Sequence, residues 1–334
     1  MEESAKAANK KLDFRVFFMY YIIYMKHIII STIAVLLSAS LCYSQARTLP
    51  NKKDVAQFLQ DVSVTIKSES ENSKSEGSGV LINRKIGAEQ VAFVWTCAHV
   101  IDNLRNIRNV VNEKGGSVKI VEFDDPQIIK ELVEGGRRVG EIKMDAKVIK
   151  YSDYEHGHDL ALLMVRARDY SKASAKFYLS KEDSIIPIGT RLFHVGSLLG
   201  QMGANSMTTG IISQIGRVED KVEFDQTTVT AFPGSSGGGV YLEDGRYVGM
   251  IARGAGEGFN LMIPIRRIKN WAKENNVLWA IDPTAKTPPV KEILSMSIES
   301  SGLKTAETKK SKNKKRMNFL IRTTKYESQS IQTQ

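Results

Sequence analysis

The sequence contains only two cysteines, Cys42 and Cys97, among 334 residues. Cys42 lies in an N-terminal segment that we expect to be cleaved, which would leave Cys97 without a partner and exclude an intramolecular disulfide. No internal repeat of fixed period is present, so nothing indicates a repeat architecture. The fold must therefore be held by a buried core, and a chain of this size with 42% hydrophobic residues can supply one.

Acidic residues are nearly absent from the C-terminal part. Between Lys304 and Lys325 there are nine Lys or Arg and one acidic residue, Glu307, so this segment carries most of the formal net charge of +10. We expect residues 281–334 to form a basic, disordered tail, because the apolar pattern fades after Pro283. Such tails are usually only solvated. If this one binds a partner, we expect an anionic membrane surface and no nucleic acid.

Residues 1–46 have the pattern of a targeting segment. From Met25 onward, a short basic start is followed by the apolar run IIISTIAVLLSASL and by Ser44 and Ala46, which fit positions −3 and −1 of a cleavage site. The pattern favours a signal peptide, and an uncleaved membrane anchor is the alternative, since about 20 apolar residues span a bilayer. Either way, the folded part is expected to be secreted or to lie in the periplasm or cell envelope.

Residues 47–280 contain many short apolar or alternating runs separated by Gly, Asn and Asp. This spacing predicts an all-β sandwich or barrel. The expected strands include VSVTIK, GSGVLI, VAFVWT, SVKIVEF, DAKVIKY, DLALLMV, TRLFHVG, TTGIISQIG, TTVTAF, GVYL, YVGMIA and FNLMIP.

Three helices are expected beside the strands. Asp54 is a candidate cap for a short helix that bears Val55, Phe58 and Leu59. In residues 124–136, DDPQIIKELVEGG, Pro126 fits a first helical position and Gly135 a stop. Residues 264–276 form the third, a terminal helix with cations opposite its apolar face, which consists of Ile265, Ile268, Trp271 and Ala272.

The segment AFPGSSGGGVYL, residues 231–242, places four glycines around two serines. A serine hydroxyl becomes a good nucleophile only when a base takes its proton, and the reaction needs N–H donors aimed at the developing oxyanion. Glycines let a chain turn sharply and let successive N–H groups converge, which fits Ser236 at the centre of the segment. Taken alone, the segment fits a glycine-rich hairpin equally well.

Two further segments supply partners for this serine. TCAHV places His99 at the end of the apolar run VAFVWT, where the chain leaves the core, and HDLALLMV places Asp159 at the start of another apolar run. A carboxylate at that position can hold an imidazole in one tautomer. The order His99, Asp159, Ser236 is one of the known orders of a catalytic triad, the one found in chymotrypsin-like β-barrels.

Together these segments resemble the trypsin-like serine peptidases, which have the chymotrypsin fold, and in particular the protease domain of the HtrA/Deg group. The resemblance covers roughly residues 60–275 and extends to IGTRLFHVGSLLG, TTGIISQIGR, VGMIARG and FNLMIPI. It implies a protease domain over residues 47–280 with two packed antiparallel β-barrels. The first is expected at about residues 60–170 and the second at about 185–263, followed by a helix at about 264–276.

The same resemblance implies a serine endopeptidase that cleaves protein or peptide substrates through an acyl-enzyme. Ser236 matches the nucleophile, His99 the general base and acid, and Asp159 the carboxylate that orients it. The backbone N–H groups of Gly234 and Ser236 match the oxyanion hole. No metal and no organic cofactor are implied.

The resemblance also suggests where substrate binds. Thr230 would lie near the base of the pocket for the residue before the cut, and Ala252, Arg253 and Gly254 would form the edge that pairs with substrate backbone. Because Thr230 carries no negative charge, we expect a small or medium apolar residue in that pocket and not Lys or Arg. Arg253 could favour acidic residues further upstream, and an exposed arginine without a role is the alternative.

The sequence departs from these families at three points. Ser235 stands where they commonly have Asp or Asn, so activation by a freed N-terminus is not expected. Residues 281–334 are too few for the PDZ domain that follows the HtrA protease domain, so none is expected here. Cys97 replaces a small apolar residue before the histidine, and we expect it to be a small buried hydrophobe.

Two alternatives stay open from the sequence. His156 and His158 alternate near Asp153 and Glu155, which could suggest a metal site, but the ligand set is incomplete and ordinary loop histidines are the better interpretation. The chain could also be a catalytically retired binding module on the same fold. The complete set of His99, Asp159, Ser236 and the glycine segment argues against that.

Overall fold

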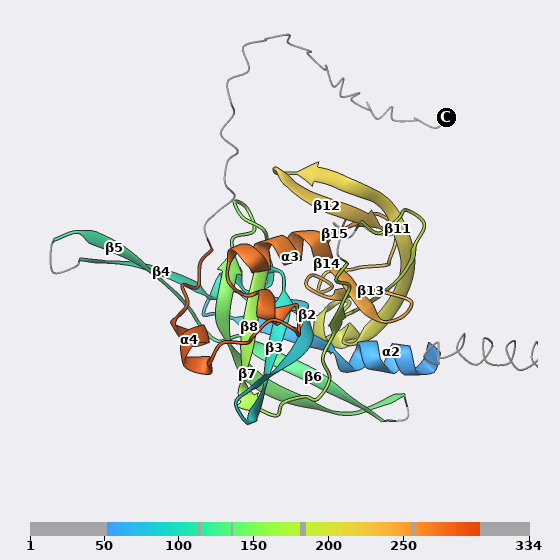
Figure 1. Ribbon diagram of the computed structural model, residues 1–334, viewed down its shortest axis with the longest axis horizontal. Helices are drawn as coiled ribbons and strands as arrows, with labels where there is room; N and C mark the ends of the chain where they lie inside the picture. Colours follow the sequence, from blue (N-terminus) through green and yellow to red (C-terminus); the bar gives the residue numbers. More distant parts are fainter. Residues whose placement is uncertain (1–51, 112–114, 135, 181–184, 255–257, 301–334) are drawn as a thin grey trace, which may run out of the picture. The chain divides into compact units, whose positions relative to one another are not determined.

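The computed structural model describes residues 52–111, 115–134, 136–180, 185–254 and 258–300 (Figure 1). The expected signal or anchor segment and the basic stretch after Ser300 lie outside the described residues. Within the described ranges, no helix has both the length and the apolar content needed to cross a membrane.

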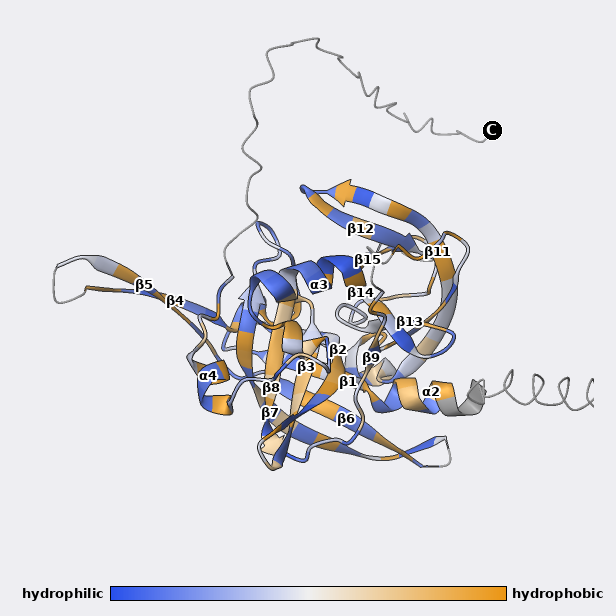
Figure 2. Ribbon diagram, in the orientation of Figure 1, coloured by the Kyte–Doolittle hydropathy of each residue, from blue (hydrophilic) through white to orange (hydrophobic). Residues whose placement is uncertain are grey.

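Six antiparallel strands close the first barrel in the order β1-β2-β3-β8-β7-β6, with β6 returning to pair with β1 (Figure 1). Apolar residues gather on the central strands β3 and β8 (Figure 2), where Phe93, Trp95 and Leu163 are fully buried. The strands are β1 (Ser63–Glu69), β2 (Lys74–Ile86), β3 (Glu89–Thr96), β6 (Gln127–Glu134), β7 (Arg137–Ser152) and β8 (Leu160–Arg168).

A second barrel follows along the chain in the order β13-β10-β11-β12-β15-β14 and closes through pairing of β13 with β14. Leu192, Ile212, Val240 and Met262 belong to its buried core. The two-residue β9 (Lys176–Phe177) adds to the β14 edge in parallel. The strands are β10 (Arg191–Gly196), β11 (Ser206–Glu219), β12 (Val222–Thr227), β13 (Gly239–Leu242), β14 (Arg246–Gly254) and β15 (Asn260–Pro264). The prediction of an all-β protein with two antiparallel barrels is confirmed.

A two-stranded sheet and three helices complete the described part. Strands β4 (Arg105–Val111) and β5 (Ser117–Phe123) pair only with each other. The helices are α2 (Lys52–Asp61), α3 (Ile265–Glu274) and α4 (Val290–Ser295). The terminal helix is confirmed as α3, and Trp271 packs edge-on against Trp95 of the first barrel at 5.8 Å between ring centroids. Helix α2 begins at Lys52, before Asp54, so Asp54 is not its cap.

The prediction of a helix over residues 124–136 is wrong. Most of this segment forms β6, which pairs with β1 on one side and with β7 on the other. Ile128 and Ile129 are both buried although they are adjacent. Their spacing to Leu132 and Val133 imitates a helix, but hydrogen bonds from two neighbouring strands outweigh that local preference.

Two further expectations need correction. TTVTAF is not a strand, because β12 begins earlier, at Val222, and ends at Thr227. Residues 281–300 were assigned to the tail from their sequence, yet here they continue the folded part. Ile293 of α4 is buried, and the N–H of Tyr151 donates to the carbonyl of Ile298 at 2.8 Å.

Candidate active site

The loop that carries Ser236 depends on two glycines with positive φ. Gly234 has φ +95° and Gly237 has φ +82°. A Cβ atom on Gly234 would lie 2.3 Å from the carbonyl oxygen of Ser197, and one on Gly237 would lie 2.2 Å from that of Ser78. No larger residue fits at either position, so the glycine-rich segment is a tightly packed turn and not a loose linker.

A single buried residue of β2, Ser78, holds this loop against the first barrel. Its N–H donates to the carbonyl of Ser236 at 2.8 Å. Its Oγ donates to the carbonyl of Gly234 at 2.7 Å and accepts from the N–H of Ser197 at 2.7 Å. The hydroxyl of Thr96 donates to the carbonyl of Ser78 at 2.7 Å. The loop therefore has fixed partners on both sides of Ser236.

Ser235 braces the same loop from within. Its N–H donates to the carbonyl of Phe232 at 2.9 Å, and its Oγ accepts from the N–H of Phe232 at 3.1 Å. The side chain is buried and stabilises a local turn. Among the described residues, no acceptor binds the N–H of Gly234 or of Ser236. These two donors are the ones that the resemblance assigns to an oxyanion hole.

His99 and Asp159 meet at the ends of β3 and β8. His99 lies in a short 3-10 turn, Ala98–Val100, and its Nδ1 is 2.9 Å from Oδ2 and 3.1 Å from Oδ1 of Asp159. The His99 N–H also donates to Oδ1 at 3.0 Å. Because the carboxylate accepts a hydrogen bond from Nδ1–H, it favours the tautomer in which Nε2 is free to take a proton. The ring of Tyr154 packs edge-on at 6.4 Å from that of His99.

Asp159 is almost fully buried and has a left-handed backbone, with φ +53°. Its N–H donates to the carbonyl of Asp153 at 3.2 Å. Asp and Asn adopt this conformation more readily than other non-glycine residues. The turn therefore aims the carboxylate at His99 through a backbone shape that few residues tolerate.

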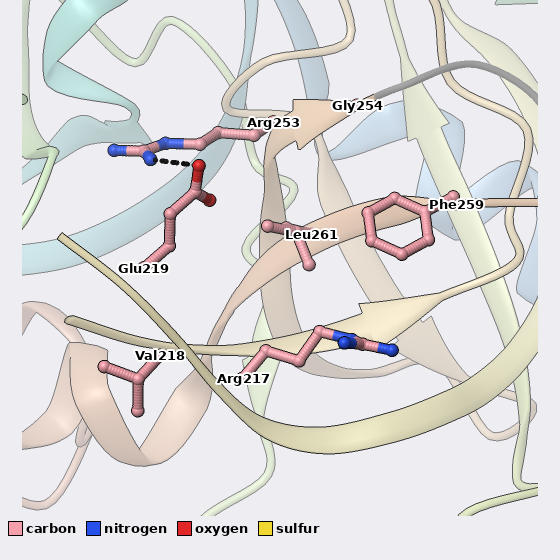
Figure 3. A pocket seen from close by; sticks show the side chains of 7 residues that line it. All are labelled: Arg217, Val218, Glu219, Arg253, Gly254, Phe259 and Leu261. Carbon is pink, nitrogen blue, oxygen red and sulfur yellow. Dashed lines mark ion pairs between the residues drawn. The ribbon is translucent and has the colours of Figure 1, made fainter. Parts of the chain in front are cut away.

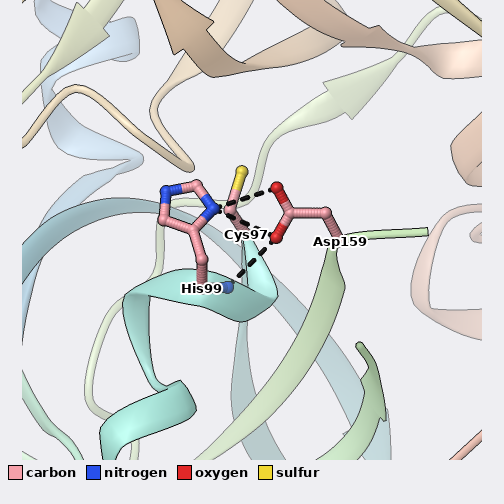
Figure 4. Close-up of side chains that lie close together, drawn as sticks. All are labelled: Cys97, His99 and Asp159. Carbon is pink, nitrogen blue, oxygen red and sulfur yellow. Dashed lines mark hydrogen bonds and ion pairs between the residues drawn. The ribbon is translucent and has the colours of Figure 1, made fainter. Parts of the chain in front are cut away.

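Cys97 lies beside this pair (Figure 4), and its sulfur, a ring nitrogen of His99 and a carboxylate oxygen of Asp159 lie within 4.8 Å of one another. The thiol is fully buried and donates to the carbonyl of Ile251 at 3.3 Å. Burial raises the pKa of Cys97 well above its usual range, which disfavours the thiolate that a metal would need. Cys97 therefore fits the expected role of a small buried hydrophobe.

His156 and His158 do not converge on a shared ligand position. The side chain of His156 is 86% exposed, whereas His158 is half-buried. Burial, aided by the positive charge of Arg267, lowers the pKa of His158 to about 4. Among the described residues, the metal-like grouping is the one around His99 and does not include either histidine.

Two adjoining cavities flank Ser236 and His99. The larger, about 820 Å³, is lined by His99, Asp159, Ala252 and Arg253 among others. The smaller, about 220 Å³, contains Ser236 and is lined by Ala231, Phe232, Pro233, Ile251, Arg253, Gly254 and Asn260. The Ser236 Oγ lies 3.5 Å from the carbonyl of Ala252, at the limit of a hydrogen bond. Between His99 and Ser236 the described structure contains no hydrogen bond.

The structure brings three of the four predicted substrate residues to these cavities. Ala252, Arg253 and Gly254 lie on β14 and line one or both of them. Thr230 does not line the pocket beside Ser236. Its carbonyl instead accepts from the hydroxyl of Thr208 at 2.9 Å, and the next residue, Ala231, faces the pocket.

Arg253, which the sequence offered as a candidate contact for acidic substrate residues, already has partners within the described structure. It forms ion pairs with Glu219 and Asp220, both at 3.1 Å, at the turn between β11 and β12. Figure 3 shows the pair with Glu219 at the edge of a third cavity of about 390 Å³, which Phe259 and Leu261 also line. The carboxylates of Glu219 and Asp220 therefore compensate the positive charge of Arg253.

Phe232, Pro233, Ile251 and Asn260 line the Ser236 pocket but were not singled out from the sequence. Phe232 and Pro233 directly precede GSSGG, so their position in the sequence could have identified them as pocket residues. Asn260 is fully buried, and its Nδ2 donates to the carbonyl of Val229 at 2.7 Å. It is the first residue of β15, 24 positions along the chain from Ser236, and nothing local marks it.

The chain matches the sequence model of the trypsin-like peptidase domain over residues 77–250, which is more than half of its length. It therefore belongs to the trypsin-like peptidase family. Among curated proteins it is similar to the serine protease Do-like HtrA of Lactococcus lactis subsp. cremoris, at 31% identity over 185 residues. It is also similar to the protein of the same name from Bacillus subtilis, at 25% identity over 218 residues. The predicted resemblance to the HtrA group is confirmed.

These alignments cover 53% and 61% of this chain but only 36% and 40% of the relatives. The chain thus spans well under half the length of the curated relatives it matches. Among solved structures, the serine endoprotease from Yersinia pestis aligns with 68% of this chain and 66% of its own, at 18% identity and a TM-score of 0.48.

Replacing Ser78 with alanine should loosen the Ser236 loop. The Gly234 carbonyl would lose its donor and the Ser197 N–H its acceptor inside the protein, which costs about 1–3 kcal/mol of unfolding free energy. Urea denaturation measures this loss. Ser295→Ala, at an exposed serine of α4, serves as a control that should stay within about 0.5 kcal/mol of the parent protein. Equal stability of the two variants would contradict the role of Ser78.

His194 of β10 should make the protein less stable in acid. The side chain is fully buried below the Ser236 loop, with Nδ1 3.0 Å from the carbonyl of Gly239, and burial lowers the pKa of His194 to about 4. As the pH falls from about 6.5 to about 4, His194 binds a proton in the unfolded chain but not in the folded protein. The unfolding free energy should therefore fall by about 3 kcal/mol over that window from this group.

Urea titrations at several pH values test this contribution. His194→Asn should reduce the slope of unfolding free energy against pH between pH 6.5 and 4 by the equivalent of about one bound proton, and the similar contribution of half-buried His158 should remain. His156→Asn, at an exposed histidine, should leave the slope as it is in the parent protein. An unchanged slope in His194→Asn would refute the assignment.

Proposed function

We propose that this protein is a serine endopeptidase that cleaves peptide bonds in protein substrates. The observation that carries the proposal is the hydrogen-bonded pair of His99 and Asp159 next to a rigid glycine turn bearing Ser236. Membership of the trypsin-like peptidase family supports it. Membership of that family implies that the substrates are proteins or peptides.

The proposed mechanism uses Ser236, His99, Asp159 and the N–H groups of the glycine turn. His99 takes the proton of Ser236 through Nε2 while the oxygen of Ser236 attacks the scissile carbonyl, and Asp159 stabilises the resulting imidazolium. The free N–H groups of Gly234 and Ser236 bind the oxyanion. His99 then gives the proton to the leaving amine, and water, activated by the same imidazole, releases the acyl group from Ser236.

The cleft suggests how a substrate is held. An extended peptide can pair with the β14 edge at Ala252–Gly254, where main-chain hydrogen bonds fix its register. The residue before the cut would enter the 220 Å³ pocket beside Ser236. No carboxylate lies among the described residues that line this pocket, and Ala231, Phe232 and Ile251 are apolar. A small or medium apolar side chain fits best.

A second candidate is a binding module whose catalytic function is lost. The observation that favours it is the position of the Ser236 Oγ, which lies near the Ala252 carbonyl and forms no hydrogen bond with His99 in the described structure. Catalytic hydrogen bonds are often loose in the absence of substrate, so this position is also compatible with an enzyme. We therefore favour the enzyme.

We also propose that the folded part acts outside the cytoplasm. This rests on the pattern of residues 1–46 alone, and N-terminal sequencing of the mature protein would test it. A chain that begins at residue 1 in the cytoplasmic fraction would contradict this location.

Labelling with a fluorophosphonate probe tests the nucleophile. The probe reacts with serines that a neighbouring base activates, so the purified protein should be labelled, and peptide mapping should place the adduct on Ser236. Ser236→Ala should abolish labelling, whereas Ser295→Ala should not change its rate. Folded protein that stays unlabelled would refute the enzyme and favour the binding module.

A peptide library tests the pocket. The cleavage rate should be highest with Ala, Val or a residue of similar size before the cut, because a cationic side chain would find no counter-charge there. Cleavage after Arg or Lys at about 10-fold higher kcat/KM than after Val would contradict the assignment of the pocket.

A further inference from the structure

Arg267, in the first turn of α3, points into the protein and is only 8% exposed. Its neighbour Arg266 makes a bidentate ion pair with Asp225, with both contacts at 2.7 Å, and a further one with Glu223. Arg267 makes no ion pair within the described part of the chain. Its guanidinium donates to two backbone carbonyls, that of Glu223 at 3.0 Å and that of His158, and lies over the ring of Phe224 at 4.6 Å.

A buried guanidinium without a paired carboxylate is costly, so its electrostatic surroundings must supply a counter-charge. Burial lowers the pKa of Arg267 to about 10, and the largest opposing influence is the negative charge of Asp159. Arg267 therefore remains protonated at neutral pH. The carboxylate that binds His99 thus acts on Arg267 through its charge, although no hydrogen bond joins the arginine and aspartate side chains.

The contact with His158 reaches Asp159 through the backbone. The carbonyl of His158 and the N–H of Asp159 belong to one planar peptide unit. Arg267 donates to that carbonyl, and the N–H donates to the carbonyl of Asp153 at 3.2 Å. The peptide unit is thus held at both ends, immediately before the left-handed turn that aims the carboxylate of Asp159 at His99.

We propose that Arg267 is a positioning residue for the active site. It fixes the peptide unit that precedes Asp159 and supplies the positive charge that balances the buried carboxylate. The inference rests on the proposed function and adds to it a residue from the terminal helix, outside the two barrels. Arg267 touches neither substrate nor the reacting atoms, so it acts through Asp159 and His99.

Other charged and titratable groups surround His99 and Asp159 and bear on any pH profile. They come from the end of β3, the turn before β8, the β11–β12 turn and β14. These groups are Cys97, Asp102, Tyr154, Glu155, His156, His158, Asp220 and Arg253. Arg253 lies over Phe224 at 5.1 Å and is already paired with Glu219 and Asp220. Unlike Arg253, Arg267 has no ion-pair partner in the described structure.

Three variants test the proposal, with fluorophosphonate labelling rate measured against pH. Arg267→Met removes the charge and both donors, so labelling should slow by about 10-fold or more. Its pH midpoint should rise by about half a unit, because loss of a nearby cation favours the imidazolium. Arg267→Lys keeps the charge but not the planar fork, so its midpoint should stay close to that of the parent protein while its rate falls.

Arg266→Met is the matched control. It breaks the ion pairs of α3 with Asp225 and Glu223, so it should lower the unfolding free energy without moving the pH midpoint. If Arg267→Met slows labelling but leaves the midpoint unchanged, as the control does, Arg267 is merely structural and the proposal is overturned. Unchanged rate and midpoint in Arg267→Met would overturn it as well.

A second measurement separates this inference from the proposed function. The ¹³Cε1 resonance of His99, assigned with His99→Gln, reports the titration of its imidazole whether or not the protein reacts with the probe. If the parent protein is not labelled, the enzyme proposal fails. An upward shift of the His99 midpoint in Arg267→Met would still support the positioning role, and no shift would reject it.

Discussion

Ser78 joins the β2 strand of the first barrel to the loop of Ser236 through its N–H and its hydroxyl, while its carbonyl accepts from the hydroxyl of Thr96 at the end of β3. Hydrogen bonds between buried groups are most significant when the loss of one partner leaves the other unsatisfied, and each of these contacts is of that kind. Ser78 thus forms hydrogen bonds with β3, which ends near His99, with the glycine turn and with Ser197. Hydrogen bonds between the first barrel and this loop of the second barrel therefore help to fix Ser236 relative to the end of β3, which His99 follows.

The strands of both barrels could be predicted because alternating apolar residues need only local sequence to be recognised. β6 could not. Ile128, Ile129, Leu132 and Val133 fit a helical face as well as a strand, and the outcome depends on β1 and β7 as neighbours. The segment around Ile293 was missed for a related reason. It is polar apart from a few residues, and only the surface of the first barrel makes its burial favourable.

The positions of His99, Asp159 and Ser236 were predictable because each stands at the end of a strand or in a glycine turn. Thr230 was placed by resemblance alone, and a shift of one residue directs Ala231 to the pocket in its place. Arg267 was grouped with the exposed cations of α3, because the helical pattern assigns it to the polar side. Its burial depends on β12 and on the turn before Asp159, which lie far from it in the sequence.

The left-handed backbone of Asp159 restricts what can replace it. Glycine and asparagine adopt this conformation with little strain, whereas glutamate does not, so the nearest chemical substitute for the carboxylate is the poorer structural one. Asparagine has nearly the same shape as aspartate and lacks only the charge. A single substitution to asparagine at this position would therefore keep the turn and the surrounding packing while removing the negative charge beside His99.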